Sequence, residues 1–231
     1  MSHDHSAPPQ GASVTPLPHT LPPPDVKPSR LVATMGIFSA IAGVLIVVAF
    51  QGTKPRIEHN RAVVLAAAIN EVLATPPTVR TVFVYNGQLV EALPAGVDSA
   101  GLDRIYLGLD AAGRPRGFAI TAGEPGFTHV INLIFGYDPA SGKILGMKVL
   151  EEKETPGLGD RIEKDTAFVN GFSGPLAPIQ GIKRTIAKTD PHQVDMITGA
   201  TISSRAVINT INHRLEKVDP LLKAYRYGGS R

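Results

Sequence analysis

One uninterrupted apolar run, Leu31 to Phe50, constrains this chain more than any other feature of its sequence. Its twenty residues carry no charge, and as a helix rising 1.5 Å per residue they span about 30 Å, the thickness of a bilayer's hydrocarbon core. A cleavable signal peptide is the competing interpretation, but its apolar region is normally shorter, and no clean small-x-small site follows the run before Lys54 and Arg56. The sequence therefore predicts a retained transmembrane helix over residues 31–50.

Basic residues flank this run on both sides, so charge does not set its orientation. Two precede it and three follow it: Lys27, Arg30, Lys54, Arg56 and Arg61. The positive-inside rule needs an asymmetry that these residues do not supply.

Residues 1–30 are rich in proline and poor in large apolar side chains. The eight prolines of this stretch stand among Ser, Thr and His, a composition that cannot bury a core, and we predict a disordered tail. His3, His5 and His19 are irregularly spaced within it, and we assign them no metal-binding function.

Composition excludes several function classes. The 231 residues carry a net charge of only +3, with no basic stripe, so we predict no nucleic-acid partner. The absence of cysteine excludes thiolate iron–sulfur ligation, cysteine nucleophiles and disulfides, so any redox function needs another cofactor. We find no paired carboxylates, nucleophile motif or cluster of metal ligands, and therefore predict neither a catalytic residue nor a metal site.

A helical apolar face follows the anchor within a predicted juxtamembrane helix over residues 51–77. It consists of Ala62, Leu65, Ile69, Val72 and Leu73, at intervals typical of one helix face. Pro76 and Pro77 then stop the helix, and we expect its apolar face to pack on the domain that follows.

Residues 78–231 alternate between strand and helix patterns. Strands are predicted at 78–85, 88–93, 104–109, 117–121, 129–137, 143–150 and 182–187, and helices at 161–172 and 203–225, with Pro220 a weak point in the last. Short turns such as Asn86-Gly87 make neighbouring strands antiparallel. The predicted fold is a single α+β domain with a mainly antiparallel sheet and flanking helices, preceded by one transmembrane helix.

Small residues and hydroxyls cluster before the final helix, from Asp195 through Thr198, Gly199, Ala200 and Thr201 to Ser203. One interpretation is structural: Thr201 or Ser203 caps the helix and Gly199 provides the tight turn. The other is functional, because a helix N-terminus offers free N–H groups and a partial positive charge to a phosphate. The residues alone leave both open.

The order Asp-x-x-Thr-Gly-Ala-Thr-x-Ser over residues 195–203 resembles the flavinylation motif of the FMN-binding domain family. Its members include the G subunit of Rnf-type ion-translocating electron-transport complexes and the C subunit of the sodium-translocating NADH:quinone reductase. A random chain of this length would show the pattern roughly once in ten thousand cases. The resemblance implies that Thr201 bears FMN through a phosphoester, and that Asp195, Thr198, Gly199, Ala200 and Ser203 belong to its site.

A second segment resembles the same family, in the family's order. It comprises Glu154, Thr155, Pro156, Gly157, Leu158 and Gly159. Taken alone, it reads as a strand end that breaks into a loop, with Glu154 solvated. The resemblance implies instead that the backbone of residues 155–159 approaches the flavin.

The resemblance also implies function, partners and location. The chain would be an electron-carrier subunit, non-catalytic alone, beside other membrane subunits of an ion-translocating oxidoreductase complex. A flavin transferase using FAD would attach the FMN outside the cytoplasm, which places the domain on the periplasmic or external side of a bacterial inner membrane. Two alternatives stay open: a stand-alone exported flavin carrier for another reductase, and a membrane-tethered binding domain without redox function.

Overall fold

The structure, a computed structural model, describes residues 27–227. Residues 1–26, which hold most of the predicted Pro-rich tail and its three histidines, lie outside the described residues. The chain divides into two units, Met1–Pro55 and Arg56–Arg231.

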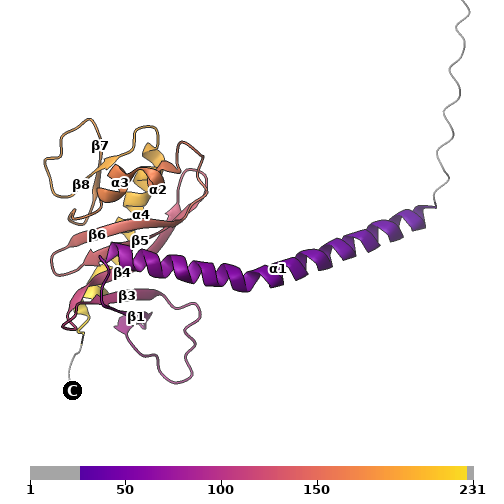
Figure 1. Ribbon diagram of the computed structural model, residues 1–231, viewed down its shortest axis with the longest axis horizontal. Coiled ribbons are helices and arrows are strands. Elements are labelled where there is room, and N and C mark those ends of the chain that lie inside the picture. The colour runs from indigo at the N-terminus through magenta and orange to yellow at the C-terminus, as the bar shows by residue number, and fades with distance from the viewer. Residues whose placement is uncertain (1–26, 228–231) are drawn as a thin grey trace, which may run out of the picture. The chain divides into compact units, whose positions relative to one another are not determined.

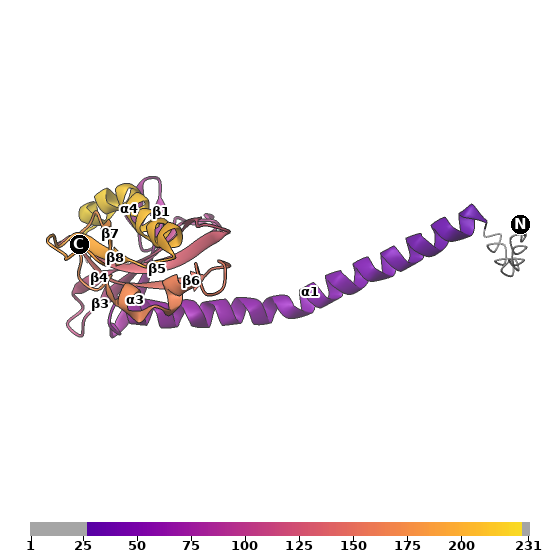
Figure 2. The same ribbon diagram turned by 90° about the horizontal axis from the view of Figure 1, so that it is seen from above.

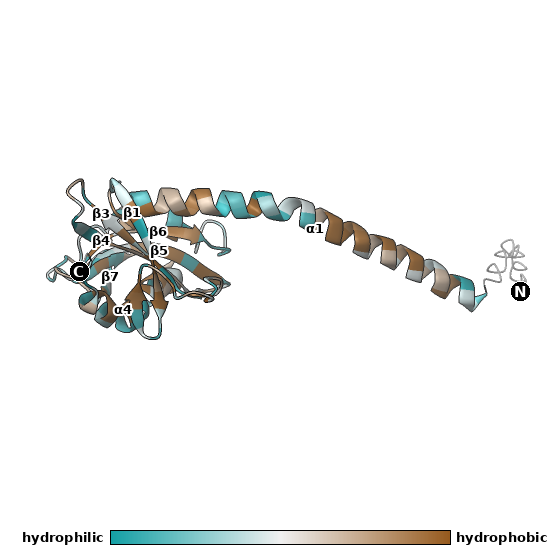
Figure 3. Cartoon of the chain, turned by 90° about the horizontal axis from the view of Figure 1, so that it is seen from below, coloured by the Kyte–Doolittle hydropathy of each residue, from teal (hydrophilic) through white to brown (hydrophobic). Residues whose placement is uncertain are grey.

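The apolar run lies within α1 (Pro28–Val72), a helix of 45 residues with Pro55 inside it. The run has a mean hydropathy of 2.5 over an 18-residue window, and none of that window is buried (Figure 3). By length and composition α1 is the one described helix able to cross a membrane. Exposed apolar side chains such as Val32 and Phe38, 72% and 71% exposed, match a lipid environment and support a single-pass membrane protein.

The second unit contains a six-stranded antiparallel sheet in the order β2-β1-β3-β4-β5-β6 (Figure 1). The strands are β1 (Thr78–Tyr85), β2 (Gln88–Val90), β3 (Arg104–Leu109), β4 (Pro115–Pro125), β5 (Val130–Asp138) and β6 (Lys143–Glu151). Apart from the short β2 at one edge, the sheet is a meander, as the turn signals predict. The predicted fold class is confirmed.

The final helix, α4 (Thr201–Ala224), packs on one face of this sheet, chiefly against β4 and β5. Its apolar face, with Val207, Ile211 and Leu215, joins the main core formed by strand side chains such as Phe135. Pro220 lies inside the helix without ending it. The first residues of α4 are thereby fixed relative to the β4–β5 hairpin.

Two regions differ from the sequence prediction. The helix predicted over 161–172 is two short helices, α2 (Arg161–Lys164) and α3 (Thr166–Asn170), because Asp165 is extended and its side chain caps α3 at Phe168 N–H. The predicted strand 182–187 is β7 (Gln180–Lys183), which pairs in parallel with β8 (Gln193–Met196), a strand that the sequence patterns do not predict.

The last part of α1 covers the opposite face of the sheet from α4 (Figure 2). Ala68, Ile69, Val72 and Leu73 are buried there against Ala119 and Ile134. Of the predicted apolar face, the C-terminal part packs on the domain, whereas Leu65 is only partly buried and Ala62 is exposed. The helix ends at Val72, because Ala74 and Thr75 both take a positive φ of 53°.

Glycines in β5 and β6 allow this close approach and yield a testable contrast. A Cβ on Gly136 would collide with the backbone carbonyl of Val72, whereas one on Gly146, its cross-strand partner, would lie 3.5 Å from the Val72 Cα, an ordinary contact. We expect Gly136→Ala to lower the free energy of unfolding by about 1–3 kcal/mol, and Gly146→Ala to leave it nearly unchanged. Thermal unfolding of the detergent-solubilised chain, followed by circular dichroism, measures the difference; equal effects would contradict this account of the helix–sheet contact.

Candidate functional site

The two sequence motifs meet at the start of α4. They line a pocket of ≈ 320 Å³ together with one side chain of the β4–β5 turn. Its residues are Phe127, Thr155, Leu158, Gly159, Gly199, Ala200, Thr201, Ile202 and Ser203. The segments 155–159 and 199–203, far apart in the sequence, thus line one pocket.

Thr201 is the first residue of α4, and its side chain is exposed in this pocket. The N-cap is Ala200, with φ −125° and ψ 33°, and no side chain caps the helix. The Ser203 hydroxyl is bonded elsewhere, so neither residue named in the structural interpretation acts as the cap. The first N–H groups of a helix lack intrahelical partners, and here they belong to Thr201, Ile202 and Ser203, which line the pocket.

Glu154 links the two motifs through a buried carboxylate, with the residue only 5% exposed. The Ser203 hydroxyl donates to Oε2 at 2.8 Å. The backbone N–H of Phe127 donates to the same oxygen at 3.2 Å, and those of Thr128 and His129 donate to Oε1 at 3.0 and 3.2 Å. The carboxylate thereby joins the β4–β5 turn to the first turn of α4, and Glu154 is not solvated.

Two glycines make room for this carboxylate. A Cβ on Gly159 would lie 2.7 Å from Glu154 Oε2 and 2.9 Å from the Ser203 hydroxyl, both buried. A Cβ on Gly126 would lie 2.7 Å from Glu154 Oε1. Any side chain at either position would separate the groups that the carboxylate holds together.

The buried carboxylate predicts a specific acid sensitivity. Burial by itself raises the pKa of Glu154, but the hydrogen bonds from Thr128, Ser203, His129 and Phe127 outweigh it, and the pKa lies below its ordinary value of 4.5. Its stabilising contribution is therefore complete above pH 4.5 and is lost as the pH falls through the lower pKa of the folded state. We expect the wild type to lose stability more steeply than Glu154→Gln between about pH 6 and about pH 3 in thermal unfolding; parallel curves would contradict this assignment.

Residues 155–158 form a tight turn at the pocket. The N–H of Leu158 donates to the Thr155 carbonyl at 3.1 Å, with Pro156 and Gly157 at the two central positions. Gly157 has φ +78°, the positive value that the third residue of a type II turn requires. Pro156 and Gly157 thus shape the loop without lining the pocket, whereas Thr155, Leu158 and Gly159 line it.

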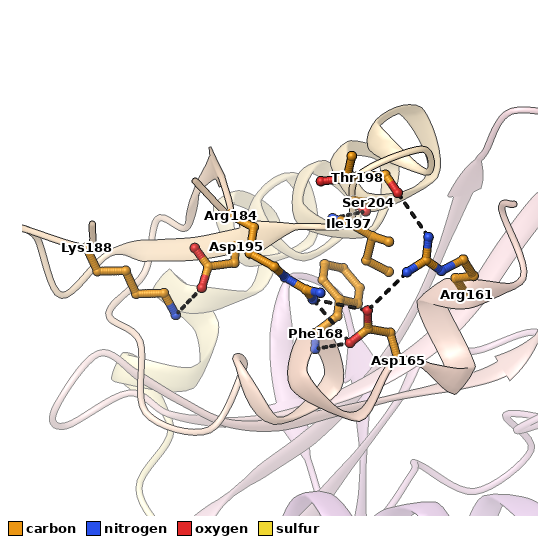
Figure 4. A network of polar contacts seen from close by, with 9 residues as sticks. All are labelled: Arg161, Asp165, Phe168, Arg184, Lys188, Asp195, Ile197, Thr198 and Ser204. Atoms are coloured by element: carbon orange, nitrogen blue, oxygen red, sulfur yellow. Dashed lines mark hydrogen bonds and ion pairs between the residues drawn. The ribbon is translucent and has the colours of Figure 1, made fainter. Parts of the chain in front are cut away.

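Asp195 and Thr198 take part in two separate sets of polar contacts near the turn that precedes Thr201 (Figure 4). Asp195 forms an ion pair with Lys188 at 3.4 Å, and its other carboxylate oxygen is buried without a hydrogen-bond partner. The carbonyl of Thr198 accepts from Arg161 at 3.0 Å.

Asp165, the N-cap residue between α2 and α3, links Arg161 to a second arginine. It bonds to Arg184 at 3.1 Å and lies 3.7 Å from Arg161. These contacts reach the turn that precedes Thr201, and neither motif residue, Asp195 or Thr198, contacts the pocket itself.

Exposed apolar side chains form the outer part of the pocket. Phe127, Leu158 and Ile202 are 66%, 52% and 57% exposed, although each comes from a different segment. Sequence reasoning did not assign Phe127 or Ile202 to the site. The available signal was the position of each residue in the sequence. Phe127 directly follows Gly126, and Ile202 directly follows the motif threonine.

The candidate site is thus an apolar-walled pocket at the uncapped N-terminus of α4, on an α+β domain that follows a membrane anchor in the chain. Residues 126–216 match the family described as the FMN-binding domain. A solved structure of Shewanella oneidensis NqrC has a TM-score of 0.60 at 17% identity, covering 70% of this chain and 97% of that one. The C subunit of the Na⁺-translocating NADH-quinone reductase from Parabacteroides distasonis has a TM-score of 0.51 at 21% identity, covering 65% and 80%. These two likenesses establish the fold.

Relatives at higher identity establish the family. The G subunit of the ion-translocating oxidoreductase complex of Photorhabdus laumondii is 34% identical over 181 residues, covering 77% of this chain and 84% of the relative. The protein of the same name in Shewanella loihica is 29% identical over 187 residues, covering 78% and 84%. The chain belongs to the family of G subunits of ion-translocating oxidoreductase complexes and carries its FMN-binding domain.

Proposed function

We propose that this chain is the membrane-anchored electron carrier of an Rnf-type ion-translocating oxidoreductase complex and holds FMN covalently through a phosphoester on Thr201. The observation that carries the proposal is the exposed Thr201 hydroxyl at the uncapped N-terminus of α4, inside an apolar-walled pocket. Relatives that are named as subunits of such complexes support the assignment to a complex.

The pocket suits FMN at both ends of that molecule. The free N–H groups and partial positive charge at the start of α4 favour a phosphate ester at Thr201, and the bare backbone of Gly199 and small side chain of Ala200 admit it. Phe127, Leu158 and Ile202 provide apolar surface for an aromatic ring. Bound FMN supplies one- and two-electron chemistry, while the protein sets its position.

The remaining motif residues have positioning functions in this proposal. Glu154 and Gly159 fix Ser203 and so the first turn of α4, and the turn of Pro156 and Gly157 brings the backbone of Thr155 to the pocket. Asp195 and Thr198 take part in the polar contacts near the turn that precedes the attachment residue.

Attachment of FMN needs a second protein. A threonine hydroxyl is a weak nucleophile, and the residues that line the pocket include no His, Lys, Asp or Glu to activate it. We therefore propose a separate flavin transferase with FAD as donor: the Thr201 oxygen bonds to the FMN phosphorus, the pyrophosphate bond breaks, AMP leaves, and the hydroxyl proton is released. Such maturation outside the cytoplasm would place the domain on the periplasmic or external face of a bacterial inner membrane.

The test is the flavin content of the chain purified from its native membrane. The proposal expects flavin fluorescence that stays with the protein band in a denaturing gel, and its absence when the chain is made in a host without the transferase. Co-purification of other membrane subunits separates the carrier of a complex from a stand-alone exported carrier. A chain without flavin despite an active transferase would favour the non-redox binding domain instead.

A further inference from the structure

A second, larger cavity lies on the sheet face opposite α4, between the sheet and α1. It measures ≈ 680 Å³ and is separate from the pocket at Thr201, with which it shares no lining residue. From the helix it is lined by Ile57, Asn60, Arg61, Val64 and Leu65, and from the sheet by Thr121, Ala122, Gly123, Asn132, Leu133, Leu150 and Glu151. We call it the α1–sheet groove.

The groove exists because only part of the helix packs tightly on the sheet. Ala68 and Val72 are fully or almost fully buried, at 0% and 2% exposure, whereas Ile57 and Val64 are 44% and 46% exposed. Most of the groove wall is nevertheless apolar, with Val64 and Leu65 on the helix side and Leu150 on the sheet side. Apolar walls left open to solvent in this way indicate a bound apolar group.

Two cations lie beside one carboxylate at the edge of the groove. Arg61 and Lys153 both lie 3.8 Å from the Glu151 carboxylate, so two cations share one anion. Both distances exceed hydrogen-bond length, and the side chains are 73% and 68% exposed, so each cation keeps donors for a further acceptor. The amides of Asn60 and Asn132 add neutral donors in the same groove.

We propose that the α1–sheet groove binds an anionic phospholipid, with an acyl chain against the apolar wall and the phosphate beside Arg61 and Lys153. An apolar wall beneath paired cations matches that amphiphile. The groove also begins near the membrane-spanning run in sequence. The run ends at Phe50, and Ile57 follows seven residues later in the same helix. Lys54 and Arg56, between the two, add to the attraction for anionic headgroups.

A photocrosslinking experiment on the full chain tests this site. Benzoylphenylalanine replaces Val64, which lines the groove, or Val63, the neighbouring residue that is 55% exposed and serves as the matched control. The chain is reconstituted in phosphatidylcholine vesicles with a minor share of phosphatidylglycerol, irradiated, and its intact mass determined. We expect lipid adducts mainly from position 64, enriched in phosphatidylglycerol over its share of the vesicle.

Neutralising the cations tests the headgroup contact separately. Arg61→Gln with Lys153→Gln is expected to reduce the phosphatidylglycerol enrichment by roughly fivefold per removed cation, while adducts at position 64 persist. Equal adduct yields at positions 63 and 64, or a phosphatidylglycerol share equal to that of the vesicle, would overturn the proposal. A protein adduct at position 64 in native membranes would also overturn it and assign the groove to a neighbouring protein of the membrane.

Discussion

Thr201→Ala is expected to abolish covalently bound flavin completely. The side chain of Thr201 is the exposed hydroxyl at the start of α4 in the pocket, whereas Ser203 and Ser204 are buried and already bonded to Glu154 and Ile197. No neighbouring hydroxyl in the first turn can therefore take over the ester. Because the Thr201 side chain caps nothing, its loss should leave the fold intact. Intact mass and in-gel fluorescence of the variant from native membranes measure the loss.

Thr198→Ala is the matched control for that experiment. Thr198 is an exposed threonine in the same turn, and it accepts from Arg161 through its backbone carbonyl, which the substitution retains. We expect Thr198→Ala to keep covalent flavin. Flavin retained in Thr201→Ala, or lost equally from both variants, would show that the ester is not specific to Thr201.

Glu154→Ala is expected to destabilise the domain and to lower flavin attachment together. Removing the carboxylate leaves the buried Ser203 hydroxyl and three backbone N–H groups without their acceptor. A buried donor left unpaired costs about 1–3 kcal/mol, and water reaches part of the exposed β4–β5 turn, so we expect a loss of about 2–4 kcal/mol in the free energy of unfolding. The first turn of α4, and with it Thr201, would lose its link to residues 127–129.

Thermal unfolding and flavin stoichiometry of Glu154→Ala give the two readouts. Lys153→Ala serves as the control, since its side chain is 68% exposed and its ion pair with Glu151 is long, at 3.8 Å. We expect that variant to match the wild type in both measurements. Unchanged stability in Glu154→Ala would contradict the bridging function of the carboxylate.

Local sequence patterns determined most of the sheet. The strand starting at Thr78 and the strand starting at Arg104 have their predicted limits, because β-branched alternation and flanking turn residues act over a few positions. β4 is longer than predicted, since Gly123 and Glu124 continue its pairing with β5 despite their weak strand preference. Cross-strand hydrogen bonds outweigh that preference.

Features that depend on long-range contacts could not be predicted. The break between α2 and α3 follows from Asp165. Its carboxylate accepts a capping hydrogen bond from Phe168 N–H, accepts another from Arg184, and lies near Arg161. In the parallel pairing of β7 with β8, Gln180 pairs with Gln193. The residues between the two strands show no periodic apolar pattern that would predict this pairing. Such pairings are set by packing on α4 and the adjoining helices rather than by local propensity.

The candidate site, too, was predicted where local sequence carries a signal and missed where it depends on long-range contacts. The motif order led to Thr201, Gly199 and the segment 154–159, and the structure brings Thr155, Leu158 and Gly159 of that segment to the pocket of Thr201. The buried state of Glu154 could not be predicted, because three of its four donors are backbone groups of residues 127–129, which carry no sequence signal. The pocket position of Ile202 was missed for a related reason: it depends on where α4 begins.

The most direct test of the central claim is fragmentation mass spectrometry of the wild-type peptide spanning residues 189–205, which trypsin releases by cleaving after Lys188 and Arg205. The peptide carries five hydroxyl residues: Thr189, Thr198, Thr201, Ser203 and Ser204. The account predicts that the added mass of one FMN ester lies on Thr201 in the chain from native membranes. An unmodified peptide from a host with an active transferase, or FMN on any of the other four residues, would contradict it.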